Sequence, residues 1–308
     1  MGLPLVSVII PTYRPEHLRE TVESALAQTI SDLEIIVVED GSDTALQALK
    51  ECCGPVRYVW QENQGVSGAR NTGMRHALGI WLAFLDHDDL WKPDKLQRQL
   101  LLAERCPEFK MIHTDYFVLR EGQLYPGPRL VPVEQVPSGH VGRELFMNNF
   151  VINSSVLVTR KACESAGRLD RRFRYAQDYD LWLRIARNHE IGFLNERLTV
   201  FRDHDYSLSN QHSQVLVECA EVLSIFVSAY PAVWKEFGVN VIRRRMSTAY
   251  WEAAYSHFCN AEYAAARSLF VKAWQWDRSC LRPLLYGLAC LTGQPGVRAM
   301  HAVRRVIT

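Results

Sequence analysis

Three carboxylates and an imidazole stand together in the run Asp86-His87-Asp88-Asp89. They follow an apolar stretch, residues 81–85, that is typical of a buried strand. Clustered carboxylates repel one another unless a cation neutralises them, and their oxygens are ligands that suit Mg²⁺ or Mn²⁺. The run therefore indicates a divalent-metal site. Taken alone, it fits equally well an acidic turn ahead of the helix start at 92–94.

A second acidic pair, Asp178 and Asp180, precedes a helix that the pattern predicts over 181–188. A carboxylate in a cleft can act as a general base on a hydroxyl, whereas one at a helix start can cap the helix. Alternate residues of an extended or capping segment point in opposite directions, so we expect only one of the two to face a cleft. His204 follows a predicted strand over 198–201 and could bind metal or phosphate.

Two further segments carry groups that could bind a nucleotide. Asp40 ends a predicted strand and could hydrogen-bond a base or ribose, although an Asp-Gly turn with Gly41 is the alternative. In 63–71, glycines permit close backbone approach and Arg70 offers a planar fork for a phosphate or base carbonyl. A helix start with a surface arginine is the alternative there. The sequence contains no Gly-Lys-Ser/Thr, so it does not predict a Walker loop.

The elements that must position these groups alternate along the first hundred residues. Strands are predicted over 6–10, 34–38, 56–60 and 81–85, with helical spacing behind Pro15 and after Ser67, which could be a cap. This alternation implies βαβ units, and so an α/β fold with a mainly parallel sheet and flanking helices. Right-handed crossovers would gather Thr12, Asp40 and Asp86 at one sheet edge. Later strands are predicted over 111–119, 154–159 and 198–201, with a loop over 120–140.

Bulk properties describe an ordinary globular chain of 308 residues, 48% hydrophobic, with a net charge of +1 that gives no argument for nucleic acid binding. Its eight cysteines have no Cys-x-x-Cys spacing, which favours reduced thiols over zinc or disulfides. The N-terminus lacks a signal-peptide pattern, and no stretch approaches the roughly 18 apolar residues of a membrane span. We therefore expect a cytoplasmic protein.

Composition changes near residue 213, which predicts a first domain over 1–212 and a helical region over 213–308. Two amphipathic helices joined near 260–262 are similar to a single tetratricopeptide-like pair, too few for a solenoid. Arg298, Arg304 and Arg305 stand among apolar residues and could touch an anionic membrane surface. The small number of charges favours a solvated helix face instead.

Together these segments resemble an inverting nucleotide-sugar glycosyltransferase of family 2, which has the GT-A fold. The resemblance spans about residues 4–210 and rests on six segments in the family's order. They are SVIIPTY at 7–13, EIIVVEDGS at 34–42, Asn63-x-Gly65-x-x-x-Ala69-Arg70-Asn71-x-Gly73, FLDHDD at 84–89, QDYDLWLR at 177–184 and Arg202-x-His204. Any one segment is weak, but their common order is highly specific.

The resemblance implies a role for each matching position. Donor binding would involve Pro11, Thr12, Tyr13, Asp40, Arg70 and Asp86, metal binding Asp88 and His204, and proton abstraction Asp178, with Asp180 as second choice. Three positions depart from the family pattern: Arg14 replaces the usual Asn, Glu39 a common Asp, and Gln177 a frequent Glu. The last departure leaves the choice between Asp178 and Asp180 open.

The activity so implied moves a sugar from a nucleotide diphosphate, a UDP- or dTDP-sugar, to a glycan or lipid-linked acceptor in surface polysaccharide or lipid-linked glycan synthesis. Such an enzyme would use Mg²⁺ or Mn²⁺ and work in the cytoplasm or at the inner face of the plasma membrane. One alternative is a sugar-phosphate nucleotidyltransferase, which would need a glycine-rich loop that residues 11–20 lack. Another is a non-catalytic nucleotide-sugar-binding scaffold, against which the acidic run and Asp178 argue. No pattern indicates an oligomeric state.

Overall fold

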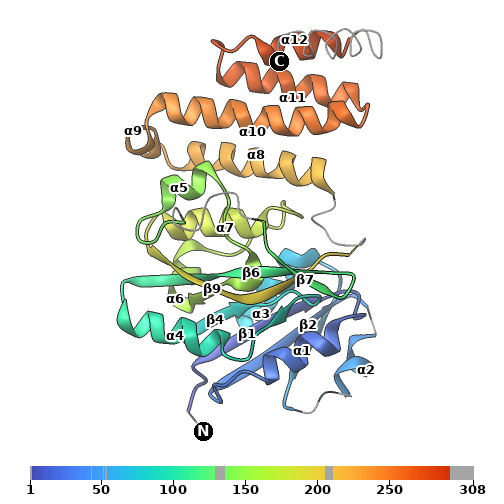
Figure 1. Cartoon of the computed structure of the whole chain (residues 1–308), viewed down its shortest axis with the longest axis vertical. Helices are drawn as coiled ribbons and strands as arrows, with labels where there is room; N and C mark the ends of the chain where they lie inside the picture. Colours follow the sequence, from blue (N-terminus) through green and yellow to red (C-terminus); the bar gives the residue numbers. More distant parts are fainter. Residues whose placement is uncertain are drawn as a thin grey trace. The chain divides into compact units, whose positions relative to one another are not determined.

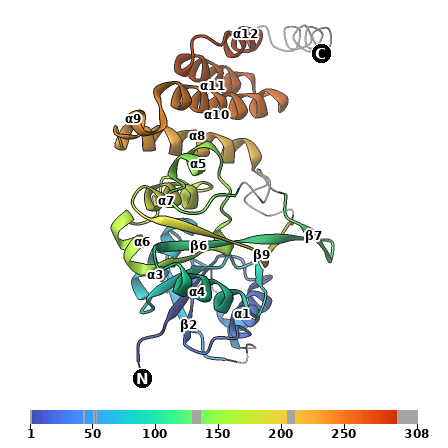
Figure 2. The ribbon, with the colours of Figure 1, turned by 60° about the vertical axis from the view of Figure 1, so that its left-hand side comes forward.

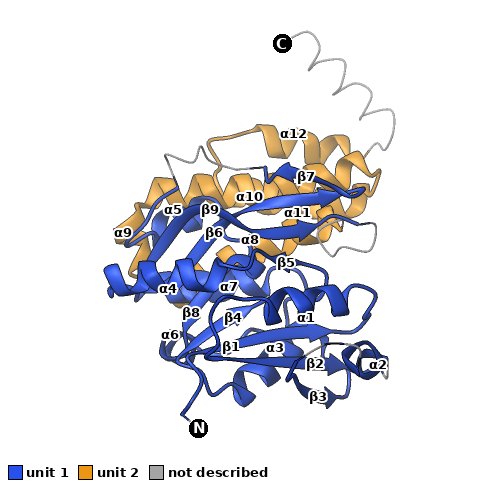
Figure 3. Ribbon diagram, turned by 60° about the horizontal axis from the view of Figure 1, so that its bottom comes forward, with its two compact units in different colours: residues 1–205 blue, residues 206–308 orange. Residues whose placement is uncertain are grey.

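The computed structural model of the chain describes residues 2–42, 44–50, 52, 54–128, 136–204 and 211–291 (Figure 1). It contains two compact units, residues 1–205 and 206–308 (Figure 3). The boundary predicted after residue 212 therefore lies inside the second unit. Arg298, Arg304 and Arg305, on which the predicted membrane contact depended, lie outside the described residues.

Unit 1 is built on one nine-stranded sheet. Its strands are β1 (Val6–Thr12), β2 (Leu33–Asp40), β3 (Arg57–Gln61), β4 (Trp81–Phe84), β5 (Leu90–Trp91), β6 (Phe109–Arg120), β7 (Gln123–Pro126), β8 (Leu157–Thr159) and β9 (Glu190–Arg202). They lie in the order β3-β2-β1-β4-β8-β6-β9-β5, with β7 paired to β6. The long pairings of β1 with β2 and β4, of β2 with β3 and of β6 with β9 are parallel. The predicted α/β fold with a mainly parallel sheet is confirmed.

Helices pack on this sheet along the whole unit (Figures 1 and 2). They are α1 (Leu18–Leu26), α2 (Ala45–Lys50), α3 (Gly65–His76), α4 (Lys95–Arg105), α5 (Gly142–Met147), the 3₁₀ helix η2 (Asn153–Ser155), α6 (Arg160–Ala166) and α7 (Gln177–Ala186). Alternation along β1 explains the layers, because successive strand residues point to opposite faces. Val8 and Ile10 join a buried core with residues of α1, whereas Ile9 lies against α3 at Gly73. A Cβ at Gly73 would clash with Ile9, so glycine lets helix and sheet approach closely.

Strand register gathers three strand ends at one edge. In the parallel pairing of β1 with β2, Thr12 lies opposite Glu39, and in that of β1 with β4, Ile9 lies opposite Phe84. Because parallel strands point the same way, Thr12, Asp40 and the run that begins at Asp86 leave the sheet on the same side. This placement agrees with the prediction.

Four element boundaries differ from the sequence-based expectation. β1 continues through Pro11, which pairs with Val38, and does not end there. α3 begins at Gly65, where φ is +74°, so Ser67 lies inside the helix and is not its cap. β9 is far longer than the predicted 198–201, because it pairs with β6 through several register shifts that hide its alternation. Within the predicted loop over 120–140, β7 forms a hairpin with β6.

Unit 2 is helical, as predicted, and consists of α8 (His212–Ala229), α9 (Val233–Phe237), α10 (Val239–Cys259), α11 (Tyr263–Trp276) and α12 (Arg282–Ala289). The helices α10 and α11 form the pair that was expected to join near 260–262. Between them and α12 lies an aromatic cluster in which Trp251, Phe258, Phe270 and Tyr286 contact one another, with ring centroids about 5–6 Å apart. Unit 2 therefore has a core of its own.

One helix in the described part of the chain, α8, is long and apolar enough to cross a membrane, with 18 residues and a mean hydropathy of 1.2. The expectation that no stretch reaches this length was wrong for α8. A third of the helix is buried inside the protein, and a core helix of a soluble protein meets the same criteria. All of the described cysteines are free thiols.

Candidate active site

The acidic loop after β4 separates its carboxylates into different environments. Asp89 is buried, and its two oxygens accept hydrogen bonds from the Ser154 hydroxyl, at 2.5 Å, and from the Arg202 backbone N–H, at 3.0 Å. Burial, together with the neighbouring carboxylates of Asp88 and Asp86, holds the pKa of Asp89 well above its usual range. Asp89 thus fastens the loop to η2 and to the end of β9.

Asp88 and His204 are brought together from distant parts of the chain. The distance from His204 Nε2 to Asp88 Oδ2 is 2.9 Å, and both side chains are partly exposed. The end of β9 holds this pair in place, because the Arg202 guanidinium donates to the Asp88 carbonyl at 2.9 Å and to the Glu20 carboxylate. The ring of His17 lies 5.6 Å from that of His204, a neighbour that the sequence did not suggest.

The donor set of Asp88 and His204 fits a hard divalent cation such as Mn²⁺ or Mg²⁺. No three His, Cys, Asp or Glu side chains among the described residues group as a ready-made metal site. Two protein ligands nevertheless match the usual arrangement for Mg²⁺, in which one or two carboxylates act with substrate phosphates and water. The geometry therefore suits a cation that arrives with a phosphorylated ligand.

Asp86 belongs to a different cluster, which α3 and η2 supply. Its Oδ1 accepts hydrogen bonds from Arg70 Nη2 at 2.5 Å and from Asn153 Nδ2 at 3.0 Å. Arg70 is only 3% exposed, yet its Nε and Nη1 have no hydrogen-bond partner among the described residues, and the same holds for Asn153 Oδ1. Unpaired buried donors are unfavourable, so this cluster is suited to an anionic, oxygen-rich ligand.

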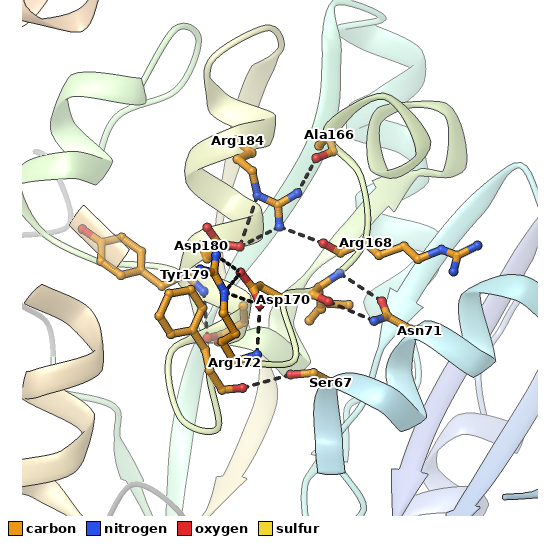
Figure 4. Close-up of polar contacts among 12 residues, drawn as sticks. Ser67, Asn71, Ala166, Arg168, Asp170, Arg172, Tyr179, Asp180 and Arg184 are labelled. Carbon is orange, nitrogen blue, oxygen red and sulfur yellow. Dashed lines mark hydrogen bonds and ion pairs between the residues drawn. The ribbon is translucent and has the colours of Figure 1, made fainter. Parts of the chain in front are cut away.

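Asp178 and Asp180 both lie in the first turn of α7, which begins at Gln177 and not at residue 181 as predicted. Two helical steps rotate by about 200°, so the two carboxylates point to opposite sides. Asp180 accepts hydrogen bonds from Arg184 Nη2 at 2.7 Å and Nε at 3.2 Å (Figure 4). The helical geometry thus commits Asp180 to an ion pair and leaves Asp178 on the other side.

Asp178 is electrostatically linked to the cluster around Asp86. Burial raises the pKa of Asp178 to about 6, the Arg70 guanidinium and the Tyr179 backbone N–H act to lower it, and the Asp86 carboxylate acts to raise it. A carboxylate with a pKa near 6 is largely ionised at neutral pH and still basic enough to accept a proton. Arg70 therefore lies within electrostatic reach of both Asp86 and Asp178.

The segment that leads into α7 is fastened to α3, the helix that carries Arg70 (Figure 4). Asn71 donates to the Leu169 carbonyl and accepts from the Leu169 N–H, both at 2.9 Å, and the Ser67 hydroxyl donates to the Phe173 carbonyl at 3.1 Å. Arg184 binds the carbonyls of Ala166 and Arg168 from the other side. One helix therefore orients both Arg70 and the approach to Asp178.

The ends of β1 and β2 carry the other residues predicted to bind a nucleotide. Asp40 is 4% exposed, and its Oδ1 accepts from Gln61 Nε2 at 2.6 Å and from the Gln64 N–H at 2.8 Å. Thr12 is buried, and its hydroxyl has no hydrogen-bond partner among the described residues. Pro11 is buried inside β1, whereas Tyr13 is 51% exposed beyond the strand end.

The three departures from the family pattern have different environments. Glu39 is buried and accepts hydrogen bonds from the hydroxyls of Ser42 and Tyr58 and from the N–H groups of Thr44 and Ala45 at the start of α2. Burial acts to raise the pKa of Glu39, but these hydrogen bonds outweigh it and lower that pKa. The longer side chain thus serves α2. Gln177 is buried with its Oε1 unpaired among the described residues, whereas Arg14 is exposed.

Sequence reasoning missed Asn153 and Ser154, which contact Asp86 and Asp89. The predicted strand over 154–159 begins at Ser154 and leaves Asn153 out, whereas residues 153–155 form a 3₁₀ helix. No local signal marks them, because their partners lie 65 or more residues away in the chain. Asn71 was part of a recognised segment without an assigned role.

An α/β sheet with these carboxylates at one edge defines a GT-A fold, and solved structures support this assignment. The mannosyltransferase PcManGT from Pyrobaculum calidifontis, solved with GDP-Man and Mn²⁺, matches with a TM-score of 0.60 and 17% identity, over 94% of this chain and 87% of that one. S. aureus TarS, solved with UDP-GlcNAc, matches with a TM-score of 0.57 and 13% identity, over 87% of this chain and 89% of that one. At these identities the likeness shows the fold alone.

Sequence comparison identifies the family. The model of "Glycosyl transferase family 2" matches residues 7–125. The chain is 31% identical over 216 residues to TuaG of Bacillus subtilis, a glycosyltransferase named for teichuronic acid biosynthesis, covering 67% of this chain and 82% of that protein. It is 28% identical over 247 residues to an uncharacterized glycosyltransferase of Rickettsia typhi, covering 79% of this chain and 74% of that protein. The chain belongs to glycosyltransferase family 2, and it is an enzyme.

Proposed function

We propose that this glycosyltransferase moves a sugar from a nucleotide-diphosphate donor, a UDP- or dTDP-sugar, to an acceptor hydroxyl with inversion at the anomeric carbon. One observation carries the proposal: the single guanidinium of Arg70 donates to Asp86 at 2.5 Å and acts on Asp178, where it opposes the rise in pKa that burial causes. The predicted donor-binding carboxylate and the predicted base are thereby joined at one site, beside the Asp88–His204 pair.

The chemistry is a single displacement in which Asp178 acts as the base. Its ionised carboxylate takes the proton from the acceptor hydroxyl as the acceptor oxygen bonds to the anomeric carbon. The bond from that carbon to the donor diphosphate breaks on the opposite face, so the nucleoside diphosphate leaves with the electron pair. The transition state is oxocarbenium-like, as in glycoside hydrolysis. The ion pair with Arg184 makes Asp180 the less suitable base.

Donor binding is assigned to the groups at the sheet edge. Thr12 and Asp40 would hold the base and ribose, with Pro11 and Tyr13 beside them, and Asp86 the ribose. Asp88 and His204 would hold Mg²⁺ or Mn²⁺. When bound, the ion supplies positive charge against the negative charge that develops on the departing diphosphate. Arg70 adds two buried nitrogens, Nε and Nη1, whose N–H groups are suited to phosphate oxygens.

The acceptor is proposed to be a glycan or a lipid-linked glycan in surface polysaccharide synthesis. Support comes from the relative TuaG, whose name assigns it to teichuronic acid biosynthesis. Free thiols among the described cysteines support a proposed location in the cytoplasm or at the inner face of the plasma membrane. Membership of the family leaves no observation in favour of a nucleotidyltransferase or a non-catalytic scaffold.

A donor-hydrolysis screen tests the proposal. The full chain is incubated with UDP-, dTDP- and GDP-sugars, each with Mn²⁺, with Mg²⁺ and with a chelator, and release of the nucleoside diphosphate is measured. We expect release from one donor class, with metal only, and loss of metal-dependent donor binding in Asp88→Asn. The configuration of the released or transferred sugar, read by NMR, should be inverted.

Three outcomes would overturn the proposal. Retention of configuration would exclude the single displacement. Release of pyrophosphate from a nucleoside triphosphate and a sugar phosphate would favour a nucleotidyltransferase. Full turnover of Asp88→Asn in the presence of chelator would exclude metal-dependent donor binding.

A further inference from the structure

A stripe of exposed leucines runs along the last described helix. Its members are Leu281, Leu285, Leu288 and Leu291, which are 60%, 53%, 53% and 59% exposed. Their spacing of three or four residues places them on one face of α12 and its ends. The opposite face of α12, with Tyr286 and Gly287, is buried in the aromatic core of unit 2. The leucine stripe is therefore the outer face of a helix that is packed on its inner face.

This stripe is not a consequence of a generally apolar surface. Elsewhere in the described chain, exposed large hydrophobic residues occur singly or in close pairs, such as Leu46 at 45%, Leu78 with Ile80, and Leu124 with Tyr125. Single exposed hydrophobic residues are normal, whereas a contiguous row marks a surface that binds something. Four leucines at helical spacing form such a row.

The same part of the chain is strongly basic. Residues 263–308 contain seven Lys and Arg and one acidic residue, Asp277, whereas residues 1–262 contain 28 Lys and Arg against 33 Asp and Glu. In the described part, Arg267, Lys272, Arg278 and Arg282 are all exposed. Although the whole chain is near neutral, its positive charge is therefore concentrated in the same stretch of sequence that carries the leucine stripe.

Arg282 links the two features. It lies one turn from Leu285 on α12, and its guanidinium lies 4.5 Å from the ring centroid of Trp251 and 5.9 Å from that of Tyr286. An exposed guanidinium that lies against aromatic rings suits the headgroup level of a bilayer, where the cation can meet lipid headgroups while its stem stays in apolar contact.

We propose that the leucine stripe of α12, with its basic surroundings, docks this enzyme on an anionic lipid bilayer. Leucines at helical spacing bury in the boundary between headgroups and acyl chains, while flanking cations pair with anionic headgroups. The excess of positive charge favours a lipid surface over an apolar protein groove, which would not require it. The surface lies entirely within unit 2, so docking is independent of the donor chemistry proposed above.

Flotation of the full chain with vesicles tests this proposal. Vesicles of phosphatidylcholine with about 30% phosphatidylglycerol should float with the protein, vesicles of pure phosphatidylcholine should bind much less, and added salt should release the protein. The variant Leu285→Glu/Leu288→Glu should lose binding by at least tenfold. Its matched control is Leu101→Glu/Leu124→Glu, which places the same charges on exposed leucines of unit 1 and should bind as the unaltered chain does.

A charge series separates the electrostatic part from the apolar part. Arg267→Gln and Arg278→Gln should each weaken binding to anionic vesicles by about fivefold, without changing the weak binding to neutral ones. All of these variants should keep unaltered donor hydrolysis in the absence of lipid. This second readout separates a failure of docking from a failure of the proposed catalytic function.

Two other occupants of the stripe would overturn the proposal. If light scattering shows a dimer that Leu285→Glu/Leu288→Glu converts to a monomer, while neither protein floats, the stripe is an interface between copies of the chain. If removal of residues 292–308 turns a chain that does not float into one that floats, those residues cover the stripe in the complete chain. Equal flotation of the Glu pair and the unaltered chain would also contradict it.

Discussion

The two acidic motifs of unit 1 look alike in sequence but divide their work by different physical means. In each, one carboxylate is committed to the scaffold and another is left for chemistry. Asp89 is buried, has no ion-pair partner in the part of the chain that the structure describes, and is held by a hydroxyl and a backbone N–H. Asp180 instead forms an ion pair with Arg184. The committed carboxylates fasten the loop after β4 and the start of α7, respectively.

The backbone explains the difference. In the loop after β4, hydrogen bonds from distant elements decide where each carboxylate points. Adjacent residues can therefore have different roles: Asp88 lies at the predicted metal site, and Asp89 holds the loop in place. In α7 the helical rotation alone separates Asp178 from Asp180. The helix therefore separates its two carboxylates by its own rotation, whereas the loop motif needs partners such as Ser154 and Arg202 to do so.

The largest effect that tests this division is expected for Asp178→Asn. Loss of the base should lower turnover by about 10²- to 10⁴-fold while donor affinity changes little, because the donor contacts remain. Burial raises the pKa of Asp178 to about 6 in the folded chain, so stability falls as the pH rises from about 4 to about 6, and the ionised carboxylate carries the full cost above pH 6. The variant should therefore melt at the same or a higher temperature at pH 8. Near-full turnover would place the base elsewhere.

Asp180→Ala should show the opposite profile. Removing this carboxylate leaves the Arg184 guanidinium, only 15% exposed, without its charge partner, at a cost of about 2 kcal/mol in the free energy of unfolding. Chemical denaturation measures this loss. Asp180→Asn, which keeps a hydrogen-bond acceptor, is the control and should lose less. If Asp180→Ala instead abolished turnover in a chain of unchanged stability, the roles of the two carboxylates would be reversed.

A smaller effect is expected where α3 fastens the segment before α7. Asn71→Ala removes both hydrogen bonds to Leu169, so Asp178 should be held less well beside Arg70. We expect turnover to fall by about tenfold with little change in the donor KM, since a misplaced group weakens the transition state more than the ground state. Ser67→Ala removes only the one hydrogen bond to the Phe173 carbonyl, so its turnover should fall less. A rise in donor KM at unchanged turnover would show that the contact serves donor binding instead.

The sequence predicted the half of this site that depends on strand ends. Parallel strands must emerge at one edge, so Thr12, Asp40 and Asp86 could be grouped from alternation and strand order alone. The opposite facing of Asp178 and Asp180 was also predicted, although for an extended or capping segment, whereas both residues lie within α7. The hydrophobic patterns of strands, with a period of two residues, and of helices, with a period of about 3.6, depend on neighbours in the chain. They can therefore be identified in a single sequence.

The supporting residues could not be predicted, because their partners are distant in the chain. Asn153 meets Asp86, and Arg202 meets Asp88 and Asp89, only after β8 and β9 join the sheet. The pairing of β9 with β6 contains register shifts, which erase the alternation that would have marked it as one long strand. Likewise, the leucines of α12 can be recognised as an exposed row only when the structure shows which face of the helix is buried.

The smallest expected effect is on the pH dependence of kcat/KM, which reports the free enzyme. Because burial raises the pKa of Asp178 to about 6, the base is half protonated there, and kcat/KM at pH 6 should be about half its value at pH 8. Below pH 6 it should fall about tenfold per unit. In Asn71→Ala this acidic fall in kcat/KM should begin at a higher pH. Arg70 acts to lower the pKa of Asp178, and it would act less on a carboxylate that is held less well beside it. Asp180→Asn should leave the acidic fall in place, whereas the residual turnover of Asp178→Asn should lack it. If the acidic fall in kcat/KM instead disappeared in Asp180→Asn and stayed in Asp178→Asn, Asp180 would be the base, and the assigned division of roles within this motif would be wrong.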